Sequence, residues 1–164
     1  MYVLYFFLLG LFLVWVPLRL LVPNLWFGKN LIPQDIPYEL EEVILKYNKE
    51  AATNEEFLGL AYGYVTEKYY GSRLKTITEF WRAFGDILVK SPGFLPCTGQ
   101  NYLLRTMLIK SNRFKEEDIK IKTVPLNLFI HQYIKVRVDD RYIDVDPWSN
   151  FLGVPIGKKS FLFG

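Results

Sequence analysis

The hydrophobic pattern divides the chain into one long apolar run and a longer part of mixed composition. Residues 1–22 contain a single charged side chain, that of Arg19. As a helix, a run of about 22 residues is about 33 Å long, enough to cross a hydrocarbon core of about 30 Å. The pattern therefore predicts an N-terminal transmembrane helix, within an anchor over residues 1–27.

Two other interpretations of this run stay open, a signal peptide and a buried core helix. No Lys or Arg precedes the run, and no A-x-A-like site follows it, which favours an uncleaved anchor. We therefore expect a single-pass membrane protein that contacts the lipid bilayer through residues 1–22. Its orientation stays open, because Arg19 and Lys29 are only two charges in favour of a cytoplasmic domain.

Beyond the anchor we expect a linker over residues 28–36 and a domain over residues 37–164. The first part of the domain has helical patterns. Thr53 and Glu56 form a capping box before an aromatic-rich segment that ends at Gly71. A second such box, at residues 76–79, predicts a further helix start. The expected helices cover residues 37–45, 53–70, 76–89 and 97–110.

The second part of the domain alternates between apolar and polar residues, which is typical of strands. Strands are expected over residues 119–124, 128–138 and 141–146. If Asp139 and Asp140 form a two-residue turn, Val138 pairs with Arg141, and this fixes the register of the hairpin. Helices first and strands second predict the α+β class, with helices packed on an antiparallel sheet.

Composition excludes several function classes. Lys and Arg total 20 and Asp and Glu total 17. This excess is too small to argue for nucleic acid, so no nucleic acid partner is expected. One cysteine and one histidine exclude an internal disulfide and any metal site with several Cys or His ligands. No glycine-rich phosphate loop occurs, and we expect no cofactor and no metal.

The single cysteine and the single histidine nevertheless form a candidate site. Cys97 lies at a predicted helix start, where backbone N–H groups and the helix dipole favour a thiolate. The hairpin register places Asp146 diagonal to His131 on one face and places its rival, Asp144, opposite Lys135. A nucleophile, a base and an orienting carboxylate are the parts of a catalytic triad. A buried structural cysteine beside an unrelated His–Asp pair is the simpler alternative.

Three segments carry a resemblance to a known family: residues 96–104 around Cys97, residues 131–138 from His131, and residues 139–148 with Asp146-Pro147-Trp148. Together they resemble the transglutaminase-like superfamily, which has a papain-like Cys-His-Asp fold. The resemblance covers residues 53–150. It implies that Cys97 is the nucleophile, that His131 is base and acid, and that Asp146 orients the histidine.

The chain also departs from that family. Pro96 stands where many members have Gly, and Tyr133 stands where many have Trp. The family's oxyanion hole combines the cysteine N–H with an upstream side chain, for which Trp81 is the candidate here. Tyr69, Tyr133 and Trp148 are candidates for a substrate groove, although core packing explains each of them as well.

The function expected from these features is a membrane-anchored, cysteine-dependent acyl-transfer enzyme that works through a thioester on a protein or peptide. Resolution by water would make it a peptidase or amidase, and resolution by an amine would make it a transglutaminase or another acyltransferase. One alternative is a catalytically inactive transglutaminase-like interaction module at the membrane. Another is a membrane-anchored α+β domain in which the three residues meet by chance.

Overall fold

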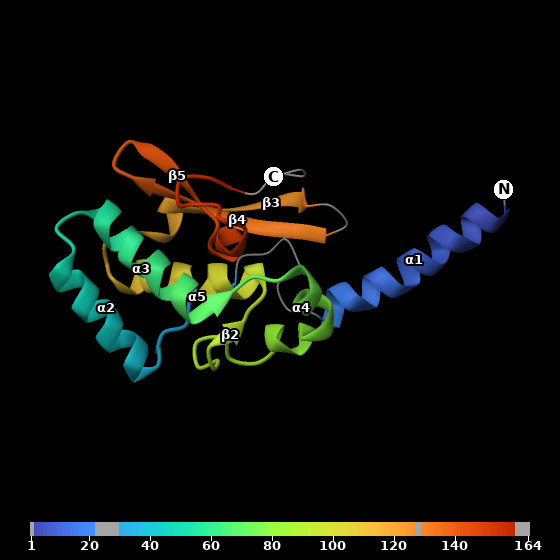
Figure 1. Ribbon diagram of the computed structural model, residues 1–164, viewed down its shortest axis with the longest axis horizontal. Coiled ribbons are helices and arrows are strands. Elements are labelled where there is room, and N and C mark those ends of the chain that lie inside the picture. The colour runs from blue at the N-terminus through green and yellow to red at the C-terminus, as the bar shows by residue number, and fades with distance from the viewer. Residues whose placement is uncertain (1, 22–29, 127–128, 160–164) are drawn as a thin grey trace.

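The computed structural model describes residues 2–21, 30–126 and 129–159 of the chain. Helix α1 covers Tyr2–Leu21 and extends away from the rest of the molecule in Figure 1. Residues 22–27 of the expected anchor lie outside the described residues. So do residues 28–29 of the expected linker and the last five residues of the expected domain.

The prediction of a transmembrane helix is wrong. Within the described ranges, no helix has both the length and the apolar character that a bilayer crossing requires. A crossing needs about 20 consecutive apolar residues. The expectation of a single-pass membrane protein is wrong for the same reason.

The helices of the domain pack around one central member. Helix α2 covers Tyr38–Glu50, α3 covers Asn54–Lys68, and α5 covers Cys97–Lys110. Helix α5 packs against α2, α3 and the sheet (Figure 1). The capping box of α3 is present as predicted, since Thr53 Oγ1 accepts from the Glu56 N–H. The apolar side chains of α3 and α5 with no exposed surface are Phe57, Leu58, Ala61, Val65, Leu104, Met107 and Leu108.

The helix predicted over residues 76–89 is wrong. Helix α4 covers Arg73–Thr78, and Ser72 caps it by accepting the Lys75 N–H. Thr76 therefore lies inside the helix, where its hydroxyl donates to the Ser72 carbonyl instead of capping. A short 3-10 helix, η1, follows over Phe80–Ala83, and Gly85 then adopts a left-handed φ of 76°.

The sheet confirms the predicted register. Strands β3 (Ile119–Leu126), β4 (Phe129–Val138) and β5 (Arg141–Val145) form an antiparallel sheet in that order. Val138 pairs with Arg141, and Asp139 takes the left-handed φ of 53° that a tight turn favours. Residue 128 of the expected strand lies outside the described residues. Helices packed on this antiparallel sheet confirm the α+β class.

A second, very small sheet holds the chain just before Cys97. Strand β1 (Tyr69–Tyr70) pairs in parallel with β2 (Gly93–Phe94). The guanidinium of Arg82 donates to the carbonyls of Phe94 and Ser91, at 2.5 and 2.6 Å. These contacts fix the segment that leads into α5. The remaining short helices are η2 (Glu116–Asp118) and η3 (Pro147–Leu152).

Gly71, which directly follows β1, packs closely against η3. A Cβ atom on Gly71 would lie 2.2 Å from the backbone oxygen of Trp148 and 2.7 Å from the Phe151 ring. Because backbone cannot move as a flexible side chain does, Gly71→Ala is expected to lower the free energy of unfolding by about 1–3 kcal/mol. Urea denaturation followed by circular dichroism measures the change.

Gly59→Ala is the matched control for Gly71→Ala. Gly59 lies inside α3, and a Cβ there meets nothing within 4 Å. Alanine in an open helical position is expected to raise the free energy of unfolding by about 0.5–1 kcal/mol. Equal changes in the free energy of unfolding for the two substitutions would show that η3 leaves room for a Cβ atom at Gly71.

Candidate active site

Cys97 is the first residue of α5, and its side chain is partly exposed. The N-cap is Pro96, which provides no side-chain hydrogen bond to the first turn. No side chain at the cap accepts a hydrogen bond from the first backbone N–H groups of α5. The positive end of the helix dipole therefore lies next to the sulfur of Cys97. The sulfur of Cys97 therefore lies at the positive end of α5, at a position that solvent reaches.

His131 and Asp146 form a buried pair. The distance from His131 Nε2 to Asp146 Oδ2 is 2.8 Å, and their side chains are 2% and 1% exposed. His131 lies in β4, and Asp146 directly follows β5, so the hairpin register brings them together as predicted. The rival carboxylate, Asp144, instead lies 3.2 Å from Lys135 Nζ.

Helix η3 holds the carboxylate of Asp146 in place. Asp146 is the N-cap of this helix, and its carboxylate accepts the Ser149 N–H at 3.3 Å and the Ser149 hydroxyl at 2.8 Å. The Trp148 ring lies against the His131 ring, with 5.1 Å between centroids. The role of Ser149 was not predicted. Asp146 as N-cap, Pro147 in the first turn and Ser149 three residues after the cap form a helix-start signal that identifies it.

The surroundings of His131 favour its charged form. Burial of the ring by itself lowers the pKa, but the hydrogen bond with Asp146 and the neighbouring Cys97 side chain outweigh it, and the pKa of His131 rises from 6.5 to about 10. Since Nε2 contacts Asp146, the other ring nitrogen, Nδ1, is the one left for the thiol of Cys97. The structure therefore brings Cys97, His131 and Asp146 together in that order.

The remaining candidates lie in different surroundings. Tyr69 is 1% exposed, and its hydroxyl donates to the Lys90 carbonyl, so it belongs to the core. Tyr133 is also buried, and its hydroxyl accepts from Lys159 Nζ at 2.9 Å. Trp81 is 56% exposed and contacts the Phe80 ring. Its role as an oxyanion donor stays a prediction.

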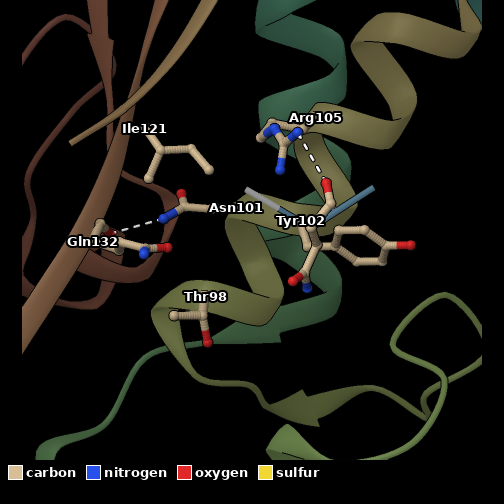
Figure 2. Close-up of a pocket in the computed structure, with 7 residues that line it drawn as sticks. Thr98, Asn101, Tyr102, Arg105, Ile121 and Gln132 are labelled. Carbon is tan, nitrogen blue, oxygen red and sulfur yellow. Dashed lines mark hydrogen bonds between the residues drawn. The ribbon is translucent and has the colours of Figure 1, made fainter. Parts of the chain in front are cut away.

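A small pocket lies beside the first turns of α5 (Figure 2). It measures about 220 Å³, part of which is open solvent, and its enclosed part has about the size of one water molecule. Ligand pockets typically have about 300–1,000 Å³, and this pocket is smaller. The residues that line it are Asn30, Thr98, Asn101, Tyr102, Arg105, Ile121 and Gln132.

Polar side chains inside α5 are a feature that sequence analysis missed. Gln100, Asn101, Arg105 and Thr106 are all at most 2% exposed. Gln100 Nε2 donates to the Leu95 carbonyl, and Asn101 Nδ2 donates to the Gln132 carbonyl, both at 2.8 Å. Asn101 and Arg105 follow Cys97 at intervals of four, so the helical period alone places all three on one face.

Metal binding has no support in the described ranges. No group of three or more His, Cys, Asp and Glu side chains there is placed to hold a metal ion.

Comparisons of the chain with protein-family models, curated proteins and solved structures found no match. The transglutaminase-like resemblance thus stays a prediction from the residues quoted above.

Proposed function

We propose that the protein is a cysteine-dependent acyl-transfer enzyme, with Cys97 as nucleophile, His131 as acid and base, and Asp146 as the orienting group. One observation carries the proposal. The chain's only histidine lies buried between a carboxylate and the chain's only cysteine, at the start of a helix. Burying two ionisable side chains is destabilising unless their polar atoms all have partners. Here Cys97, a partly exposed nucleophile, is the further partner of His131.

The first half-reaction forms a thioester. The Cys97 thiolate attacks the carbonyl carbon of an amide, and the carbonyl oxygen becomes an oxyanion beside the uncapped N–H groups of α5. The imidazolium of His131 gives its Nδ1 proton to the nitrogen of the leaving amine as the C–N bond breaks. Asp146 remains bonded to Nε2 and keeps the ring in the orientation that this transfer requires.

The second half-reaction restores the enzyme. Water or a second amine attacks the thioester carbonyl, and neutral His131 accepts its proton. The bond from carbon to sulfur breaks, and the thiolate leaves beside the newly formed imidazolium. Water yields a carboxylic acid, and an amine yields a new amide. The transglutaminase-like resemblance supports an amide of a protein or peptide as the acyl donor.

Trapping the thioester tests the proposal directly. With p-nitrophenyl acetate at pH 7, the folded protein is expected to gain one acetyl group about 100-fold faster than the urea-unfolded chain. Intact-mass spectrometry measures the adduct, and hydroxylamine should remove it, since a thioester is cleaved by this amine. Because the chain has one cysteine, the modified thiol is known. Equal rates in the two states would contradict the enzyme and favour an inactive interaction module.

A further inference from the structure

One buried hydrogen bond joins the helix that carries Cys97 to the strand that carries His131. Asn101 lies one turn after Cys97 in α5, and Gln132 directly follows His131 in β4. Asn101 Nδ2 donates to the Gln132 backbone carbonyl at 2.8 Å (Figure 2). The side chain of Asn101 is only 2% exposed, so the bond is shielded from bulk solvent.

An amide at this position lowers the stability of the fold relative to an apolar side chain. The Oδ1 atom of Asn101 is buried and has no hydrogen-bond partner in the described part of the chain. A buried polar atom without a partner is destabilising, whereas an apolar side chain would pack here without that cost. Leu104 and Leu108, one and two turns further along α5, show that buried apolar side chains fit in this helix. The bond to β4 is thus the feature of Asn101 that an apolar residue does not supply.

The position of this bond matters for the reacting atoms. The carbonyl of Gln132 belongs to the peptide unit that begins one residue after the His131 Cα atom. The hydrogen bond from Asn101 to that carbonyl sets the position of β4 along the axis of α5. It also sets the distance between the strand and the helix. The His131 ring has only two rotatable bonds beyond its Cα atom, and Asp146 holds its far nitrogen. The remaining variable is the distance between α5 and β4.

We infer that Asn101 is a positioning residue, whose amide holds β4 against α5 so that the His131 ring meets the Cys97 thiol. This inference rests on the proposed function, because it assigns Asn101 no contact with substrate. Tertiary packing, and not a local turn, brings the thiol and the ring together. A hydrogen bond between α5 and β4 near both groups therefore affects the distance between them directly. A misplacement of about 1 Å between reacting groups can cost about 100-fold in rate.

The test compares two asparagines that both tie α5 to a neighbouring element. Asn48 Nδ2 donates to the Ser111 carbonyl at 3.1 Å, at the opposite end of α5 from Cys97. Asn101→Ala and Asn48→Ala each remove an amide that bonds to a backbone carbonyl. Three quantities are measured in both: the free energy of unfolding in urea, the rate of iodoacetamide labelling at pH 7, and the His131 titration by ¹⁵N NMR.

We expect Asn101→Ala to slow labelling by about 10-fold and to lower the His131 midpoint by about one pH unit or more. Asn48→Ala should leave the labelling rate within about twofold and the midpoint unchanged, whatever its stability. If Asn101→Ala does not fold, Asn101→Leu removes the amide while filling the space. Labelling and titration that change equally in the Asn101 and Asn48 variants would overturn the positioning role alone. An ordinary His131 titration in the unaltered protein would overturn the proposed function as well.

Discussion

His131→Ala is expected to slow alkylation of Cys97 by iodoacetamide at pH 7 by about 10- to 30-fold. The thiolate is the reactive form, and an ordinary thiol is only a few per cent ionised at pH 7. In the structure the imidazolium of His131 is the charged partner of the thiol, so removing the ring removes that stabilisation. One cysteine and one histidine make both the labelled and the altered residue unambiguous.

Two control variants accompany His131→Ala. Cys97→Ser should abolish labelling and reduce acyl transfer by several orders of magnitude while the fold persists, since sulfur and oxygen differ little in volume. Lys135→Ala lies in the same strand but removes only the ion pair with Asp144, so its labelling rate should match that of the unaltered protein. A folded His131→Ala variant that is labelled at the unaltered rate would contradict the assignment of Cys97 and His131 as a reactive pair.

Asp146→Asn is expected to lower the pKa of His131 from about 10 to near or below its ordinary value of 6.5. Burial of the ring disfavours the imidazolium, and the hydrogen bond to the Asp146 carboxylate is the largest influence that opposes this burial. At pH 7.5 the ring should therefore change from charged to neutral. The ¹⁵N chemical shifts of the single histidine report this change directly.

Asp144→Asn is the matched control. Asp144 is the neighbouring carboxylate of the same hairpin, and it lies beside Lys135 in a partly exposed pair. Such pairs contribute about 0.2–1 kcal/mol, so the free energy of unfolding should change little. The His131 titration should not change at all. A shift after Asp144→Asn that equals the shift after Asp146→Asn would contradict the buried pair.

The raised pKa of His131 also sets the direction of a pH effect on stability. The folded protein keeps a proton on this ring up to about pH 10, whereas the unfolded chain releases it near pH 6.5. Stability from this proton is therefore complete below pH 6.5 and is lost as the pH rises through 10. Asp146→Asn should reduce this loss.

The hairpin was predictable because its signal is local. Alternation with a period of two residues marks which side chains share a face, and the turn at Asp139 allows one register only. That register brought Asp146 to His131, as the 2.8 Å distance shows. The capping box at Thr53 was predictable for the same reason, since its partners lie three residues apart.

Features that depend on distant neighbours were not predictable. The strand pair β1–β2 spans only two residues on each side, too few for any periodicity. Asn101 has a polar neighbour only once β4 packs on α5, and the sequence shows merely an amide within an apolar pattern. The second capping box failed because Ser72 starts α4 earlier and leaves Thr76 inside the helix. The apolar run at the N-terminus gave a transmembrane prediction that the described structure contradicts.

The connection of the sheet divides the contacts of His131 into one that is local in the sequence and one that is distant. Strands β4 and β5 are joined by a two-residue turn, so closing this hairpin costs little chain entropy and is fast. Cys97 reaches the same place only when α5 docks, a contact between segments far apart in the chain. The contact between the histidine and its carboxylate is therefore local in the sequence, whereas the contact between the histidine and the thiol depends on how α5 packs against the sheet. A local opening of α5 from the sheet is therefore expected to separate the thiol from the His131 ring while the hairpin persists.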